Sequence, residues 1–292
     1  MLATREGDHG LAYLRLALRI DPAMDEAWIL VGEAMMAAGD RDAGRDAFEH
    51  VRPASSEYAT AQTRLAMSLS AAGDKDGAMA AAETAFRAAP ETPEAVLVYA
   101  ELLRAAERYD EAAAAVQRLI PAYGATPLGW RLYYVKGACE ERAGRWAEGE
   151  ADLKRAVELK GDDPELLNYL GYAWADRGEH LKEAEAMLTK AAALQPESGA
   201  IADSLGWVRF RLGERREALR LLERAAGLSP ADPDVNEHLG DAYWSVGRQL
   251  EAAYQWRRVL TLDPGKRTRE RVQVKLASAN ASVAAHAAAA AP

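Results

Sequence analysis

The chain has 292 residues, of which 49% are hydrophobic and 28% charged, a composition typical of a folded protein with one large or two ordinary domains. Its formal net charge of -9 argues against a nucleic-acid ligand, because binding to phosphates requires a clustered excess of Lys and Arg. The single cysteine, Cys139, excludes an internal disulfide and a cysteine-based zinc site.

The first ten residues, MLATREGDHG, are too charged for a signal peptide, and the sequence has no run of about 18 apolar residues that could span a membrane. As written, the sequence therefore predicts a cytoplasmic protein. Residues 11–22, LAYLRLALRIDP, have the pattern of the second helix of a hairpin whose first helix is missing. We interpret residues 1–24 as an incomplete repeat; a truncated start would make a periplasmic or outer-membrane location the alternative.

Residues 25–264 contain an internal repeat with a period of about 34 residues. Its clearest mark is a glycine followed by a polar residue, which recurs with spacings of 34, 71, 34, 35 and 34 at Gly39, Gly73, Gly144, Gly178, Gly213 and Gly247. Glu107 fills the vacant place inside the interval of 71 residues, and three extra residues fall in the connector 121–129. The pattern therefore predicts seven consecutive units.

Each unit predicts two helices joined by a short turn, because apolar residues recur three and four positions apart on both sides of the turn. A small residue occupies the second helix about five positions after the turn, at Gly44, Ala78, Ala112, Gly149, Ala184, Ala218 and Ala252. Proline ends the second helix in several units, since it lacks an amide donor and clashes with the preceding turn, at Pro90, Pro196, Pro230 and Pro264.

Glycine also occurs inside three first helices, where it costs roughly 0.5–1 kcal/mol relative to alanine. Gly171, Gly206 and Gly240 each follow a leucine and are spaced 35 and 34 residues apart. We interpret them as points where the first helix closely approaches the second, against the small residues of that helix.

The repeat resembles the tetratricopeptide repeat, most sharply in the segments LLNYLGYAWADRG, IADSLGWVRFRLG and NEHLGDAYWSVGR. The likeness covers residues 25–264 and implies an all-α fold, a right-handed α-α superhelix of antiparallel helix pairs whose first helices line a concave groove. After the seven repeats, residues 265–280 predict a capping helix, and the alanine-rich residues 281–292 are expected to be a disordered tail.

The resemblance places mainly aromatic and polar side chains of the later units in the groove. These residues are Tyr134, Asn168, Tyr169, Tyr172, Asp203, Trp207, Phe210, Arg211, His238, Asp241 and Trp244, with Glu237 at an equivalent place. The corresponding places of the first three units carry no aromatic residue: Glu26, Ile29, Glu33, Thr63, Met67, Leu97, Glu101 and Arg104. Because aromatic residues are enriched at recognition surfaces, we predict that the C-terminal half binds a peptide or partner helix. The alternative is that Trp207 and Trp244 only fill space between first helices.

The sequence shows no arrangement that predicts catalysis or a cofactor. The five histidines are scattered without an HxxxH or HExxH pattern, so a metal site is not expected. Cys139 lies within a predicted helix with no activating group beside it, which is typical of a small buried residue. We therefore expect a protein that is not an enzyme and needs no cofactor.

These observations favour a non-catalytic scaffold or adaptor whose groove binds a protein or peptide. One alternative is a regulatory arm separated from an enzyme domain. Another is a periplasmic adaptor that recruits a processing protease, because the last three units resemble multi-repeat proteins of Gram-negative bacteria, especially alphaproteobacteria, some of which are outer-membrane lipoproteins with that role. Self-association through the half-repeat at residues 8–20 is a further alternative.

Overall fold

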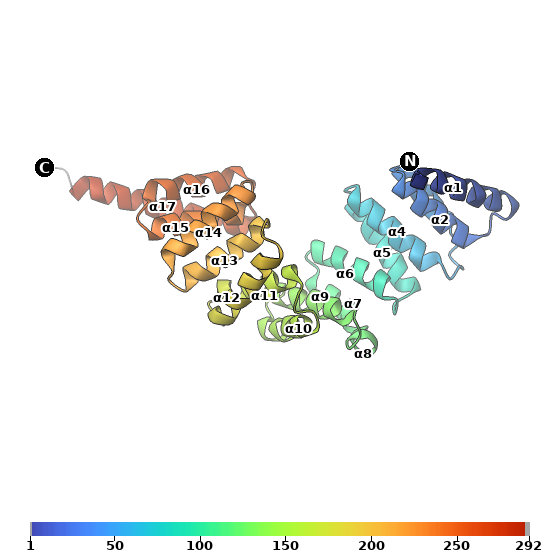
Figure 1. Cartoon of the computed structure of the whole chain (residues 1–292), viewed down its shortest axis with the longest axis horizontal. Helices are drawn as coiled ribbons and strands as arrows, with labels where there is room; N and C mark the ends of the chain where they lie inside the picture. The colour runs from blue at the N-terminus through green and yellow to red at the C-terminus, as the bar shows by residue number, and fades with distance from the viewer. Residues whose placement is uncertain (1, 290–292) are drawn as a thin grey trace. The chain divides into compact units, whose positions relative to one another are not determined.

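A computed structural model describes residues 2–289, and its side chains are described from residue 10 to residue 279. Over this range the chain is built from helices with no strand (Figure 1). The helices form two compact units, Met1–Leu159 and Lys160–Pro292. The predicted all-α fold of paired helices is confirmed.

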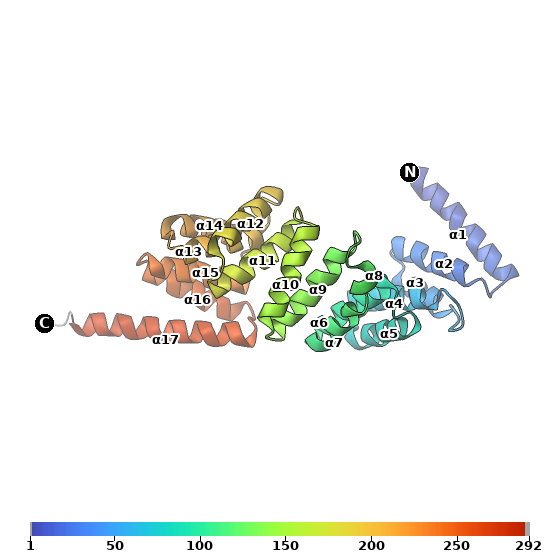
Figure 2. The same ribbon diagram turned by 90° about the horizontal axis from the view of Figure 1, so that it is seen from below.

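The first unit consists of helices that pack in sequential pairs. In chain order they are α1 (Leu2–Ile20), α2 (Asp25–Ala37), α3 (Arg41–Glu49), α4 (Tyr58–Ala71), α5 (Lys75–Ala88), α6 (Pro93–Ala105), α7 (Tyr109–Gln117), α8 (Ile120–Tyr123), α9 (Gly129–Arg142) and α10 (Trp146–Leu159). The pairs are α2 with α3, α4 with α5, α6 with α7, and α9 with α10 (Figure 2). The short helix α8 lies in the connector that breaks the 34-residue period.

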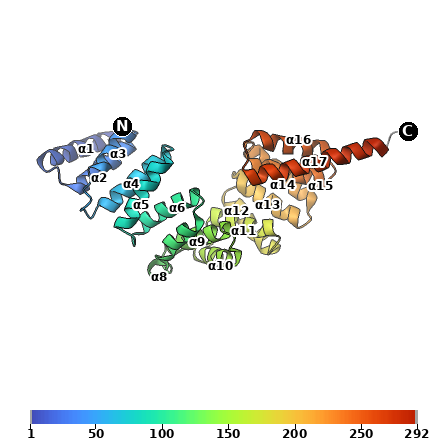
Figure 3. The same ribbon diagram turned by 180° about the vertical axis from the view of Figure 1, so that it is seen from behind.

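The second unit continues the same arrangement. Its helices are α11 (Pro164–Arg177), α12 (Leu181–Leu194), α13 (Gly199–Arg211), α14 (Arg215–Leu228), α15 (Pro233–Ser245), α16 (Gln249–Thr261) and α17 (Lys266–Ala289). They pair as α11 with α12, α13 with α14, and α15 with α16, and α17 packs against α16 and α15 (Figure 3).

Within each unit, first helices pack against the preceding pair, and α13, for example, packs against both α11 and α12. This stacking buries the apolar stripes that one helix pair alone would leave in water. The largest buried side chains accordingly come from both helices of the pairs, including Leu103 on α6, Leu132 on α9 and Leu222 on α14.

In the turn between the two helices of each pair, the residue at the predicted glycine position adopts the left-handed backbone conformation. All six glycines of the turn series have φ between 77° and 85°, a conformation that costs glycine little because it has no Cβ. Glu107 adopts φ 59° at the same place in the third pair, as the repeat spacing predicts. Several helices then begin at a capping side chain; for example, Asp163 accepts from the amide of Leu166, and Ser198 from that of Ile201.

The glycines inside the first helices do mark close helix crossings. A Cβ on Gly206 would lie 2.7 Å from Leu222 Cγ, and one on Gly171 would lie 2.8 Å from Leu188 Cγ. The facing surface is therefore mainly a leucine one turn beyond the predicted alanine. Side chains on a helix lean toward its N-terminus, so Leu222 covers the surface above Ala218.

Both chain ends differ from their predicted boundaries. Helix α1 already begins at Leu2, so the helical part of residues 1–24 is longer than the predicted 11–22. Helix α17 continues to Ala289, beyond residue 280, where the capping helix was predicted to end; alanine has the highest helix propensity, which favours continuation of the helix. The last three residues of the predicted tail, 290–292, lie outside the described residues.

Candidate functional site

The predicted groove residues lie on the first helices α9, α11, α13 and α15. Tyr134 is on α9 in the first unit, and the other ten are on three helices of the second unit. We call these ten the C-terminal wall: Asn168, Tyr169, Tyr172, Asp203, Trp207, Phe210, Arg211, His238, Asp241 and Trp244.

Three residues of the C-terminal wall are buried. Asp203 and His238 are each 5% exposed and Trp207 is 9% exposed, whereas the other wall residues and Tyr134 are half-buried. The Trp207 ring stacks on His238 with 4.1 Å between ring centroids, and on Phe210 with 5.0 Å. For Trp207, the structure supports packing rather than an open binding surface.

Trp244 is also integrated into the core, although it is less buried. Its ring lies 5.6 Å from that of Trp256 on α16, and it packs, as Phe210 does, against the buried cluster around Leu239 and Val259. Trp207, Phe210 and Trp244 of the C-terminal wall therefore all pack against other side chains of the second unit.

His238 and Asp203 form a buried polar pair between α15 and α13. The Nδ1 of His238 lies 2.8 Å from Asp203 Oδ2 and donates to it. Burial lowers the pKa of His238, but the charge of Asp203, its hydrogen bond and the nearby carboxylates Asp241 and Glu237 outweigh burial and place the pKa above its ordinary value. The pair favours the protonated imidazole in the folded state.

We expect the second unit to lose stability as the pH rises through the folded-state pKa of His238. A raised folded pKa gives a stability contribution that is fully present below the unfolded pKa, about 6.5, and is lost above the folded pKa. The melting temperature of the wild type should exceed that of His238→Gln at low pH, and the difference between the two should shrink as the pH increases. His180→Gln, a change at an exposed histidine, is the control; an unchanged gap between wild type and His238→Gln at every pH would contradict the prediction.

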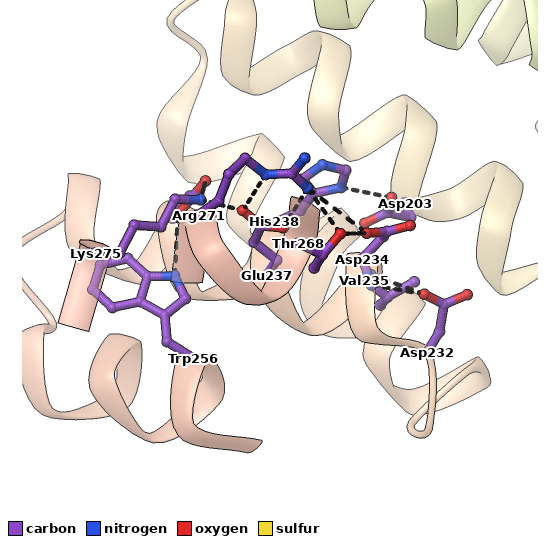
Figure 4. A network of polar contacts seen from close by, with 11 residues as sticks. Asp203, Asp232, Asp234, Val235, Glu237, His238, Trp256, Thr268, Arg271 and Lys275 are labelled. Carbon is purple, nitrogen blue, oxygen red and sulfur yellow. Dashed lines mark hydrogen bonds and ion pairs between the residues drawn. The ribbon is translucent and has the colours of Figure 1, made fainter. Parts of the chain in front are cut away.

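The carboxylates of α15 are neutralised by cations of α17 (Figure 4). Glu237, which is 2% exposed, accepts from Arg271 Nη2 at 2.7 Å and Nε at 3.0 Å, and from Lys275 Nζ at 2.7 Å. Lys275 Nζ also lies 2.6 Å from Asp241 Oδ2, whose other oxygen accepts from Trp256 Nε1 at 3.1 Å.

The network fixes α17 in the place of a further first helix. Burial raises the pKa of Glu237, but its bonds to Arg271 and Lys275 outweigh burial and hold the pKa below its ordinary range. Sequence reasoning missed the two cations, although the repeat spacing could have found them. Arg271 and Lys275 follow Glu237 and Asp241 by 34 residues each, so equivalent places on neighbouring helices carry opposite charges.

A different surface, in the first unit, is hollowed and mostly apolar. A groove of about 690 Å³ runs over α4, α6 and the start of α9. Its lining consists of Ala66, Met67, Ser70, Ala71, Pro93, Glu94, Leu97, Val98, Glu101, Leu102, Leu128 and Arg131. We call it the α4–α6–α9 groove. Met67 is 48% exposed within it, so the groove presents an apolar side chain to solvent.

Charged residues surround this apolar floor. Arg64 forms ion pairs with Glu94 and, at 3.1 Å, with Glu33, and Arg104 pairs with Glu101 at 2.7 Å. Sequence reasoning had placed Met67, Leu97 and Glu101 on the inner surface but favoured the later units because of their aromatic residues. The signal it missed is the run of small residues around Met67, which leaves room above the helix backbone.

The described residues offer little for catalysis. From residue 10 to residue 279, no group of three or more His, Cys, Asp or Glu side chains could hold a metal ion. Cys139 is fully buried, and burial raises the pKa of its thiol to about 11, which disfavours the nucleophilic thiolate. Within the described range, every helix is too short or too polar to cross a membrane.

Comparison with known proteins agrees with the repeat architecture. By sequence, the chain is 36% identical over 89 residues to the TPR repeat-containing protein PA4667 of Pseudomonas aeruginosa, and this match covers 30% of the chain and 15% of that protein. The chain thus spans a small part of this relative's length.

By structure, the chain is similar to a tetratricopeptide repeat protein from Parabacteroides merdae, with a TM-score of 0.68 and 14% identity, over 87% of this chain and 98% of that one. It is also similar to a chain of the APC/C hetero-tetramer Cut9-Hcn1, with a TM-score of 0.69 and 18% identity, over 92% of this chain and 52% of that one. At these identities the likeness shows the fold alone.

The sequence pattern of the tetratricopeptide repeat matches residues 63–127, 115–164, 140–199 and 204–266, which is more than half of the chain. The chain therefore belongs to the tetratricopeptide repeat family.

Proposed function

We propose that the chain is a non-catalytic scaffold that holds a segment of a partner protein in the α4–α6–α9 groove. The observation that carries the proposal is this apolar hollow of about 690 Å³ within a rim of charged side chains. A hollow of this size and character is typical of binding sites, because apolar contacts supply affinity and the polar rim supplies orientation.

The groove favours a segment with apolar side chains on one face. Met67, Leu97 and Val98 form a floor that a short helix or extended peptide could cover with residues spaced along one side. Complete burial of one apolar side chain of the bound segment contributes roughly 1.5–3 kcal/mol to the binding free energy. Glu94 and Glu101 are already paired with arginines, so the floor, rather than the rim, is expected to supply most of the affinity.

For the C-terminal wall, we propose a mainly structural role. Asp203, Trp207 and His238 are buried and bonded or stacked to each other, and Asp241 is bonded to Lys275. Side chains already engaged within the fold contribute little to a new interface unless the fold opens.

Met67→Lys is expected to weaken partner binding at least about tenfold, which corresponds to about 1.4 kcal/mol, because it places a charge on the apolar floor. The probe is a set of peptides selected from a random phage-displayed library against the full chain, with affinities measured by fluorescence anisotropy. Met24→Lys is the matched control, since Met24 is 43% exposed in the same unit but outside the groove. Selected peptides that bind Met67→Lys as tightly as the wild type, or a library that yields no binder, would contradict the proposal.

A further inference from the structure

The lining of the α4–α6–α9 groove includes three charged side chains, which differ in what they bond to. Glu94 forms an ion pair with Arg64, and Glu101 forms one with Arg104 at 2.7 Å. The third charge is Arg131, at the start of α9. Its guanidinium has no hydrogen bond or ion pair to any other residue that the structure describes. Both carboxylates of the lining are therefore neutralised within the chain, whereas the cation is not.

The sequence around Arg131 supplies no partner for this charge. Ion pairs along a helix form between residues three or four positions apart, and the residues at those distances from Arg131 are all uncharged. No Asp or Glu occurs between Glu111 and Glu140, although the chain has 45 acidic residues. Because Arg131 is also exposed, its charge is accessible to a carboxylate from outside the chain.

The charges near α4 have the opposite balance. Arg64, on α4, pairs with two carboxylates, those of Glu94 on α6 and Glu33 on α2, so this cluster has one more carboxylate than it has cations. The groove thus has a negative side toward α2 and α4 and a positive side at Arg131. A partner with one carboxylate binds best with that group over α9, where charges attract, and not over α4, where they repel.

The apolar floor extends to the side of the groove farthest from Arg131. Met67, which is 48% exposed, is on α4, and α6 packs between α4 and α9 in the first unit (Figure 1). Packed helix axes are about 8–10 Å apart, so the axes of α4 and α9 are separated by about 16–20 Å. An extended peptide advances about 3.3 Å per residue and crosses this width in about five or six residues. One short extended segment can therefore reach both Met67 and Arg131.

We propose that the partner segment is an extended peptide with an apolar side chain on Met67 and, about five or six residues away, an Asp or Glu whose carboxylate pairs with Arg131. This carboxylate complements the lining charge that the chain leaves unpaired. A guanidinium can donate two hydrogen bonds to one carboxylate, so the pair also fixes the direction in which the segment lies. The inference rests on the proposed function: the floor supplies affinity, and Arg131 selects the partner.

Matched peptides test the pairing. The probe is a library-selected peptide that binds the full chain, made with an amidated C-terminus so that its carboxylates are all side chains. Two further versions have Gln or Lys in place of the Asp or Glu at the proposed spacing. The wild-type chain should bind the acidic peptide about two- to fivefold more tightly than the Gln version, the usual range for an exposed ion pair. The difference should shrink in 1 M salt, where the Debye length is about 3 Å.

Variants of Arg131 test the same pair from the side of the chain. Arg131→Glu should reverse the preference, so that the Lys version binds more tightly than the acidic peptide, and Arg131→Gln should abolish it. Both variants should keep the wild-type melting temperature, because Arg131 is exposed and unpaired among the described residues. The matched control is Arg41→Glu, at an exposed arginine of the same unit that also has no bonded partner in the described part of the chain and lies outside the groove. It should leave the preference for the acidic peptide unchanged.

The outcomes separate this inference from the proposed function. Selected peptides that Met67→Lys weakens but that lack an acidic residue at the proposed spacing would overturn the pairing with Arg131 and leave the groove as the binding site. The same holds for peptides whose preference for the acidic version is unchanged in Arg131→Glu. Peptides that Met67→Lys does not weaken, or a library that yields no binder, would overturn both proposals.

Discussion

Replacing Trp207 with alanine is expected to lower the free energy of unfolding of the second unit by about 3–5 kcal/mol, the usual loss for a buried tryptophan. The Trp207 ring is 9% exposed and stacks on His238 and Phe210. Trp207 lies on α13, the helix that also carries Asp203, the partner of His238. Its removal leaves a cavity and uncovers a buried polar pair. Guanidinium unfolding of the full chain, with hydrogen exchange to locate the loss in α13 and α15, measures the effect.

The matched control for Trp207 is Tyr254→Ala, because Tyr254 is an aromatic residue of the same unit that is 60% exposed on α16. It should change the unfolding free energy by no more than about 0.5 kcal/mol. If Trp207→Ala were as mild as Tyr254→Ala but abolished peptide binding, Trp207 would belong to a recognition surface and the structural role proposed for the C-terminal wall would be wrong.

The second large effect is expected when both cations of α17 are removed. Changing Arg271 and Lys275 to methionine leaves Glu237 buried at 2% exposure without a charge partner, and loss of a buried partner costs about 3–5 kcal/mol. Because Arg271 is itself half exposed, we expect the lower end of this range. Hydrogen exchange should show earlier opening of α17 and α15.

Two comparisons isolate the charge effect. Lys266→Met with Arg267→Met removes two exposed cations from the same helix and should leave α17 as protected as in the wild type. Adding Glu237→Gln to the Arg271 and Lys275 double variant should restore part of the stability, since it removes the uncompensated charge. In the wild type, the contribution of Glu237 is present above its unfolded pKa and is lost as the pH falls through its depressed folded pKa. An unchanged α17 in the double variant would show that the ion pairs do not hold the helix.

The sequence predicted the helix pairs and their turns because both depend on local, periodic chemistry. The place of Glu107 shows how far this extends: the spacing alone assigned it to the turn series, and its φ of 59° matches the glycines there. The close crossings at Gly171 and Gly206 were also predictable, because a glycine in mid-helix needs a packing reason. Helix boundaries at the ends were not, since the alanine-rich stretch can continue a helix with little packing.

The candidate site was less predictable because burial depends on neighbours from other repeats. Helical spacing places Asp203 and Trp207 on the inner side of α13, but only the position of His238 on α15 shows that both are covered. Similarly, Glu237 is a charged residue at a predicted groove position, and only the structure shows that Arg271 is bonded to it. The hollow at Met67 arises from what its neighbours lack, and a search for aromatic residues does not detect missing side-chain volume.

The most direct test of the scaffold account is hydrogen exchange of the full chain with and without a saturating library-selected peptide. Bound peptide is expected to slow exchange in α4, α6 and the start of α9, the three elements that line the groove, and to change exchange in α13 and α15 little. Protection confined to α13 and α15, with α4 and α6 unaffected, would contradict binding in the groove and return the binding site to the C-terminal wall.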